Sequence, residues 1–84
     1  MTRYTVVWVE SVQSELARIW VDVSNRSAVT AAADEIDRVL ATEATAQGAA
    51  MSERLRALFM QPLRVLFTVS DEDRMVEVLR VRRP

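Results

Sequence analysis

The chain opens on alternating apolar residues, a pattern that predicts a β-strand. Residues 3–9 are rich in β-branched and aromatic side chains, and both faces of the expected strand carry apolar positions, such as Val6 and Val7. Because both faces are apolar, we expect this strand to be covered on both faces and not to lie at an exposed edge of the sheet.

Two helices are predicted next, because the apolar positions change to steps of three and four residues. The first helix is expected over residues 10–22 and the second over residues 27–44. Asn25 or Ser27 is the expected N-cap of the second helix, since both side chains offer an oxygen acceptor to free backbone N–H groups. The short break between the two helices predicts a helical hairpin.

Three strands are predicted in the last part of the chain, after a connector over residues 41–53 that lacks clean periodicity. They are expected over residues 54–60, 63–69 and 74–82, with short links that favour antiparallel pairing. The sequence therefore predicts a single domain over residues 1–84. Its class is α+β in the order β-α-α-β-β-β, with a small, mainly antiparallel, four-stranded sheet and the helical hairpin on one face.

Composition excludes several kinds of chemistry. The chain has no cysteine and no histidine, so disulfides, thiolate metal sites and the commonest general base are absent. A single glycine does not build a glycine-rich phosphate loop, and we expect no metal site and no cofactor. No apolar run is long enough to cross a membrane, and the N-terminus lacks a signal-peptide core, so we expect a cytoplasmic protein.

Charge is distributed unevenly along the chain. Residues 1–50 carry four arginines and seven acids, whereas residues 51–84 carry seven arginines and five acids. All eleven basic residues are arginines. The absence of lysine is explained either by codon usage in a GC-rich genome or by bidentate phosphate recognition. Codon usage does not explain why the arginines gather in the second half.

The second half of the chain resembles the RelE/ParE superfamily of toxin-antitoxin toxins. The resemblance is carried by Arg56-Ala57-Leu58, by the run from Pro62 to Val69, by the acidic turn at 71–73 and by the basic strand from Val76 to Arg83. Members typically carry an arginine followed by an apolar run, a polar hairpin and a final strand that runs into basic residues. The resemblance covers the layout of nearly the whole chain, but its motifs lie only in this second half.

This resemblance implies the toxin component of a bacterial type II toxin-antitoxin system, with roles in growth inhibition and plasmid stabilization. Such toxins act by ribosome-dependent mRNA cleavage or on DNA gyrase, and a cognate antitoxin protein neutralises them. A homodimer or a hetero-oligomer with the antitoxin is the expected assembly. Ribonuclease members use a Tyr or His near the C-terminus; here Tyr4 is the only tyrosine, which puts mRNA cleavage in doubt. The alternatives are a catalytically inactive relative and a small α+β protein-binding module.

Arg64 is the central predicted site residue. Its parity is opposite to that of Leu63 and Val65, so we expect it on the open face of the sheet, as a catalytic or phosphate-binding group. The alternative is a solvated residue, or one paired with Glu77. The predicted nucleic-acid-binding patch consists of five arginines: Arg56, Arg64, Arg80, Arg82 and Arg83. A basic strand end that only limits aggregation is the competing interpretation.

Overall fold

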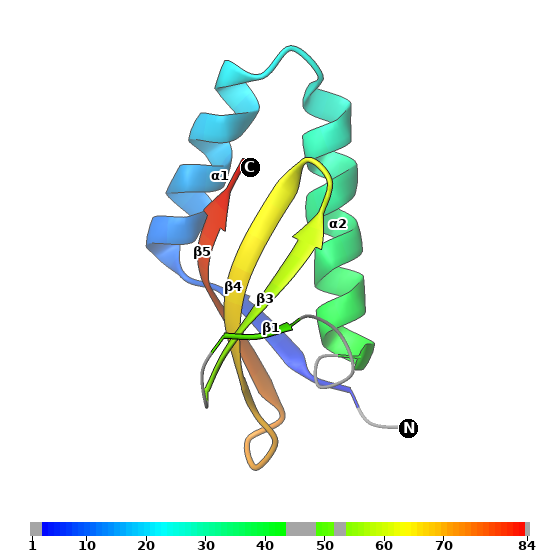
Figure 1. Ribbon diagram of the computed structural model, residues 1–84, viewed down its shortest axis with the longest axis vertical. Helices are drawn as coiled ribbons and strands as arrows, with labels where there is room; N and C mark the ends of the chain where they lie inside the picture. The colour runs from blue at the N-terminus through cyan, green and yellow to red at the C-terminus, as the bar shows by residue number, and fades with distance from the viewer. Residues whose placement is uncertain (1–2, 44–48, 52–53, 84) are drawn as a thin grey trace.

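The computed structural model describes residues 3–43, 49–51 and 54–83. It has the predicted α+β order, with one additional short strand in the connector. The elements are β1 (Thr5–Trp8), α1 (Glu10–Asp22), α2 (Arg26–Glu43), β2 (Ala49–Ala50), β3 (Leu55–Met60), β4 (Leu63–Ser70) and β5 (Met75–Arg82). Figure 1 shows the two helices side by side as a hairpin across the sheet.

The sheet has the strand order β1-β5-β4-β3-β2. β1 runs parallel to β5, and every other pair is antiparallel, as the short links predicted. The sequence predicted four strands, and β2 adds a two-residue fifth strand beside β3. Two alanines carry no periodic signal, so this strand was not predictable from the pattern. Gly48, in the predicted connector, lies outside the described residues.

β1 lies at an edge of the sheet, so the expectation that it is not an edge strand was wrong. The apolar side chains on its two faces differ in burial. Trp8 packs against the core, and its ring N–H donates to Asp37 of α2 at 3.0 Å. Val7, on the other face, is 36% exposed. The Gln13 side chain donates to the Trp8 carbonyl at 2.6 Å and so occupies one acceptor of this short edge.

Polar side chains order the turn between the helices. Asn25 is the N-cap of α2, as predicted: its Oδ1 accepts from the Ala28 backbone N–H at 3.2 Å. Arg26 satisfies two carbonyls at the end of α1, because its guanidinium donates to the Trp20 and Val21 oxygens at 3.0 and 3.2 Å. The same guanidinium lies 4.8 Å from the centre of the Trp20 ring. The turn between α1 and α2 is therefore held by the local contacts of Asn25 and Arg26.

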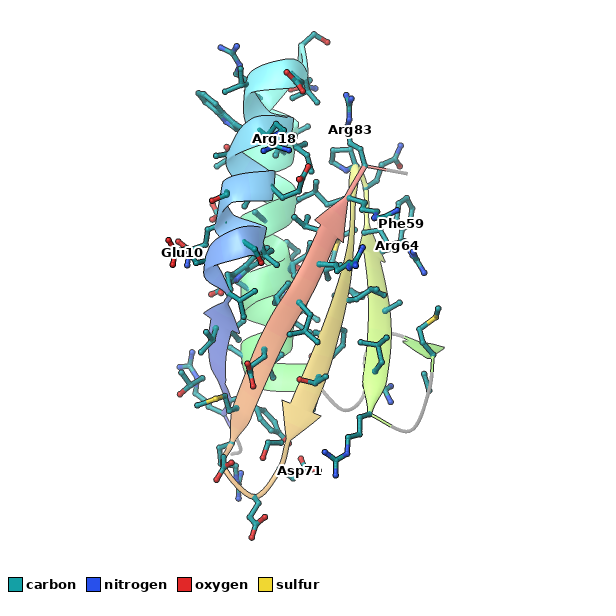
Figure 2. All side chains as sticks on the ribbon, turned by 90° about the vertical axis from the view of Figure 1, so that its left-hand side faces the viewer. Glu10, Arg18, Phe59, Arg64, Asp71 and Arg83 are labelled. Carbon is teal, nitrogen blue, oxygen red and sulfur yellow. The ribbon has the colours of Figure 1, made fainter. Side chains whose placement is uncertain are left out.

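The core lies between the helical hairpin and one face of the sheet. In β4 the predicted alternation is confirmed, since Leu63, Val65 and Phe67 are fully buried and the residues between them are not. The other face of the sheet, which we call the open face, carries no further layer among the described residues (Figure 2). None of the helices described is long and apolar enough to cross a membrane.

Candidate functional site

Arg64 projects from the open face of the central strand, as its parity predicted. It is half-buried and lies between two neighbours in register: Phe59 of β3 on one side and Arg82 of β5 on the other. Figure 2 shows Phe59 and Arg64 close together on the side of the sheet away from the helices. Since Phe59 is 57% exposed, this row presents an aromatic ring and guanidinium groups to solvent.

The last strand would turn two of its arginines toward the helices if it alternated regularly. Val76 and Val78 are fully buried on the helix-covered face. Arg80 and Arg82 have the same parity as these valines, so strict alternation places all four side chains on one face. Arg80 and Arg82 were predicted to lie together, but regular alternation would have placed them on the face that belongs to the core.

A β-bulge resolves this conflict. Leu66 and Phe67 are adjacent on β4, yet their partners on β5 are Arg80 and Val78, so Leu79 is an extra residue without a partner. An extra residue reverses the alternation that follows it. The valines of β5 therefore face the helices, and Arg80 and Arg82 face the open side. In the sequence, the signal for the bulge is the break in the spacing of the valines.

The bulge builds a cluster that we call the basic row, made of Arg64, Arg80 and Arg82. Arg64 and Arg82 are direct cross-strand partners, an arrangement that is destabilising for like charges. Among the described residues none of the three side chains forms a hydrogen bond or an ion pair. Glu77 pairs with Thr68, well away from Arg64 along β4, so the alternative Arg64–Glu77 ion pair does not form.

Arg56 does not join the basic row, contrary to the prediction. It lies opposite Phe67 in the β3–β4 hairpin, and Phe67 is buried beneath the helices. Arg56 therefore sits on the helix-covered face. The tight link at Gln61 and Pro62 fixes this register, because Met60 pairs directly with Leu63. The covered position of Arg56 follows from this pairing register.

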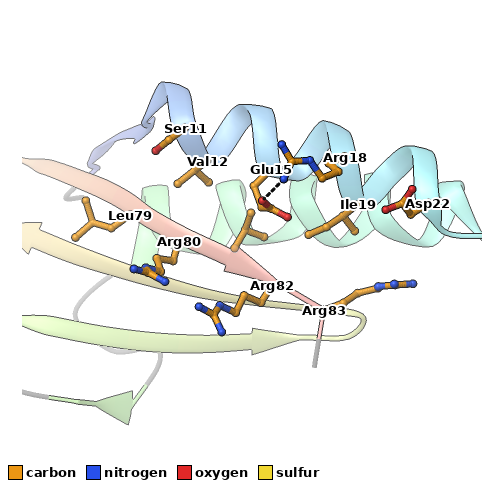
Figure 3. Close-up of a pocket in the computed structure, with 11 residues that line it drawn as sticks. Ser11, Val12, Glu15, Arg18, Ile19, Asp22, Leu79, Arg80, Arg82 and Arg83 are labelled. Atoms are coloured by element: carbon orange, nitrogen blue, oxygen red, sulfur yellow. Dashed lines mark ion pairs between the residues drawn. The ribbon is translucent and has the colours of Figure 1, made fainter.

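Arg83 follows β5 and lies beside α1 rather than in the basic row. It lines a groove whose other wall includes Arg18 and Asp22 of α1. Figure 3 shows the side chains of Arg82 and Arg83 extending in different directions. The predicted five-residue patch is thus divided. Arg64, Arg80 and Arg82 share the open face, and Arg56 is on the covered face. Arg83 follows the end of β5 and lines the groove, which Arg80 and Arg82 also border.

Tyr4, the only tyrosine, lies at the other end of the sheet. Its hydroxyl donates to Asp71 in the β4–β5 turn. Figure 2 shows Asp71 at the end of the sheet opposite Arg64. The basic row is therefore equipped to bind phosphate and to stabilise developing negative charge, with no tyrosine beside it to move a proton.

Acidic groups of the described residues do not form a metal site. One carboxyl has a shifted pKa: Arg38 of α2 hydrogen-bonds Glu35, with its Nε 3.0 Å from Oε2, and this bond lowers the pKa of Glu35. The pair is exposed on α2, remote from the basic row, so it belongs to the helix surface and not to the site.

The fold is shared with solved toxin structures. No protein-family profile and no curated protein matches the chain. A chain of the toxin-antitoxin complex RelBE2 from Mycobacterium tuberculosis superposes with a TM-score of 0.81 at 21% identity, covering 100% of this chain and 94% of that one. A chain of the ParDE system of P. aeruginosa gives 0.72 at 18% identity, with 96% of both chains covered.

A third similar structure comes from an archaeon. A chain of the RelE-RelB complex from Pyrococcus horikoshii gives a TM-score of 0.67 at 16% identity, covering 99% of this chain and 96% of that one. The coverage extends over both helices and the whole sheet. The chain therefore has the fold of the RelE/ParE toxins, as the resemblance predicted.

Proposed function

We propose that this chain is the toxin component of a type II toxin-antitoxin system. It acts in the cytoplasm on a machine that handles nucleic acid, either the ribosome with its mRNA or DNA gyrase. A cognate antitoxin protein neutralises it in a hetero-oligomeric complex. The observation that carries the proposal is the basic row, three arginines without a protein partner among the described residues, on the open face of a RelE/ParE fold.

An anion is the partner that the basic row lacks. Two guanidinium groups in direct cross-strand register repel each other, and this repulsion is relieved when a phosphate lies between them. Arg64 is half-buried, so its charge is screened less by solvent than that of a fully exposed arginine. Arg64 is accordingly the proposed centre of the site, and Arg80 and Arg82 add positive charge around it.

Binding demands less of these residues than cleavage does. An arginine pair holds a phosphate by charge and geometry alone. Cleavage of mRNA also requires a proton acceptor, and the basic row contains only guanidinium groups, which stay protonated. If the chain is an endoribonuclease, we infer that Arg64 stabilises the charge on the attacked phosphodiester while the ribosome supplies the proton transfer.

An antitoxin partner is proposed because the similar structures come from toxin-antitoxin systems. The RelBE2 and ParDE structures and the archaeal RelE-RelB structure are toxin-antitoxin systems or complexes. A chain of this size has a small core, so a partner that binds only the folded form stabilises it by mass action. We expect a short neighbouring gene to encode that partner and its product to co-purify with the toxin.

Growth on induced expression tests the proposal. We expect the wild-type chain to arrest growth, and Arg64→Ala and the double variant Arg80→Ala/Arg82→Ala to relieve the arrest. Arg56→Ala is the matched control, because it removes the same charge from the neighbouring strand on the covered face. Equal arrest by all variants at equal soluble levels contradicts the proposed site. No arrest by the wild type favours the inactive relative.

The target is distinguished during the arrest. Loss of labelled amino-acid incorporation before any change in DNA supercoiling indicates the ribosome. Relaxed plasmid DNA with continued protein synthesis indicates gyrase. Arrest with neither change contradicts both proposed targets.

A further inference from the structure

A second groove lies between the edge strand β1 and the two helices. It has a volume of about 840 Å³, and we call it the tryptophan groove because Trp8 of β1 and Trp20 of α1 both line it. None of the described residues of β4 and β5 lines it, so it is separate from the basic row. Concave, mostly apolar cavities of about 300–1,000 Å³ with a few polar groups are typical of small-molecule sites. The tryptophan groove has the size and the character of such a site.

Hydrogen bonds to α2 hold both indole rings in place. The Trp8 ring N–H donates to Asp37 at 3.0 Å, and the Trp20 ring N–H donates to Thr30 at 3.2 Å. Each bond joins a ring from β1 or α1 to α2, so the three elements that form the groove are fixed to one another. Ala17 of α1 also lines the groove, and its short side chain leaves space there. The groove is therefore already formed in the free protein, as most ligand sites are.

The lining of the tryptophan groove is negatively charged. Of the described residues that line it, only Asp34 and Asp37 are charged. They lie three residues apart on α2, so both carboxylates are on the same side of that helix. Asp34 is exposed, and among the described residues its side chain forms no hydrogen bond or ion pair. A positively charged group is the complement that the groove lacks.

The indole rings favour the same kind of ligand, because the face of an aromatic ring attracts a cation. The chain itself contains one such contact: the guanidinium of Arg26 lies 4.8 Å from the centre of the Trp20 ring. Arg26 contacts this ring from the start of α2 and does not line the groove. Both aspartates of the groove are thus left without a basic partner among the described residues.

A strand from another protein does not suit this groove. β1 is only four residues long, and the Gln13 side chain donates to the Trp8 carbonyl at 2.6 Å. Gln13 and Trp8 both line the groove, so part of the hydrogen-bonding capacity of the β1 edge is already used there. Strand addition gains its affinity from free backbone groups along such an edge. Apolar walls with two carboxylates suit instead a compact ligand that has an apolar body and one positive charge.

We propose that the tryptophan groove binds a small organic cation, a primary ammonium group carried on an apolar body. The apolar body packs against Trp8, Leu16 and Trp20, and the ammonium group lies beside Asp34 and Asp37. Because the ligand contacts β1 and both helices, its binding raises the free energy of unfolding. The proposal does not rest on the toxin function, since the groove and the basic row share no residue.

Tryptophan fluorescence tests the proposal, because both tryptophans of the chain line the groove. The probes are three compounds of similar shape and different charge: 2-phenylethylamine, 2-phenylethanol and 3-phenylpropanoate. We expect a saturable change with the amine, binding of the neutral alcohol that is about tenfold weaker or more, and no response to the anion. Equal responses to all three compounds, or no response to the amine, overturn the proposal.

A charge variant locates the ammonium group. Asp34→Asn is expected to weaken amine binding by about fivefold at low ionic strength, the effect of one unit charge at contact distance in water. Asp22→Asn is the matched control, because it removes the same charge from the end of α1 and does not line the tryptophan groove. Equal weakening by both variants indicates an effect of net charge and contradicts the placement.

A volume variant locates the apolar body. Ala17→Leu places a larger side chain in the groove and is expected to abolish the response to the amine. Ala31→Leu is the control, since Ala31 is exposed on α2 and does not line the groove. Alanine and leucine are both strong helix formers, so both variants are expected to keep the wild-type circular dichroism. Undiminished binding by a folded Ala17→Leu variant contradicts the placement.

Two other occupants give different results. A short peptide of Lys and Leu residues is the additional probe, and its saturable binding without any response to the amine indicates a segment of a partner protein. Light scattering reports the oligomeric state. A dimer that dissociates on dilution with a change in tryptophan fluorescence, again without a response to the amine, indicates a second copy in the groove. Either result overturns the proposal of a small organic cation.

Discussion

Side chains on the open face are arranged unfavourably for the stability of the free protein. Arg64 and Arg82 occupy facing positions on the open side of β4 and β5, where an apolar pair would pack better. Phe59, in the same row, leaves more than half of its surface exposed. The repulsion between the arginines and the exposure of Phe59 are unfavourable in the free molecule. Both are consistent with a surface that binds a ligand.

We predict that Arg64→Leu stabilises the free protein by about 0.2–1 kcal/mol, because it removes a like-charge cross-strand pair and adds an apolar neighbour for Phe59. The measurement is urea unfolding at low ionic strength. The wild-type chain is expected to gain stability when salt or phosphate is added, since both reduce the repulsion between Arg64 and Arg82.

Arg3→Leu serves as the control for this stability measurement. Arg3 is exposed near β1, away from the basic row, so its removal changes the net charge equally without relieving a paired repulsion. A stability gain of the same size in Arg3→Leu, or a loss in Arg64→Leu, is the result that contradicts the cross-strand explanation.

Elements that depend on local pattern were predictable, and those that depend on pairing were not. The first helix was predicted over the residues that α1 occupies, Asn25 was correctly among the expected caps, and the alternation of β4 placed Arg64 on the open face. These features arise within one element. The edge position of β1 and the covered position of Arg56 depend on which strands become neighbours and in which register.

The bulge in β5 lies between these two cases. Its signal was present, since Val76 and Val78 are followed by a valine three residues later rather than two. Periodicity alone does not say whether such a break ends a strand or bulges it. The β4–β5 pairing decides the matter, and the positions of Arg80 and Arg82 follow from it.

We predict that deletion of Leu79 is tolerated. Val78 would still pair with Phe67 and Arg80 with Leu66, now without an extra residue, so the basic row keeps its face. The expected loss in unfolding free energy is about 1 kcal/mol or less, because only a partly exposed side chain is removed. Circular dichroism and urea unfolding provide the measurement.

Deletion of Leu66 is the matched control for the bulge. It makes Val65 and Phe67 adjacent, and two neighbouring strand residues cannot both face the helices. Because both side chains are fully buried, expelling either is expected to cost about 3 kcal/mol or more. If the two deletions are equally damaging, Leu79 has a structural role beyond being the extra residue of the bulge.

At the scale of the whole molecule, one compact layer of helices and one sheet share a small core. The buried residues come from both helices and from β3, β4 and β5, and no described residue covers the open face. A chain of 84 residues typically has a total stability of about 4–13 kcal/mol. The loss of one core side chain therefore removes a large fraction of the free energy of unfolding. A bound partner offsets part of that loss.

Ile36→Ala tests this dependence on a partner. Ile36 of α2 is fully buried, and its truncation is expected to cost about 2–5 kcal/mol, enough to lower the soluble yield of the free chain sharply. Co-expression with the product of the neighbouring antitoxin gene is expected to restore the yield, because a partner at a hundredfold excess over its Kd adds about 2.7 kcal/mol. Val21→Ala, at a residue that is 60% exposed, is the control and should behave as the wild type in both conditions. If the co-expressed protein raises the yield of neither the wild type nor Ile36→Ala, it does not bind the folded chain, and the proposed toxin-antitoxin pairing loses its thermodynamic basis.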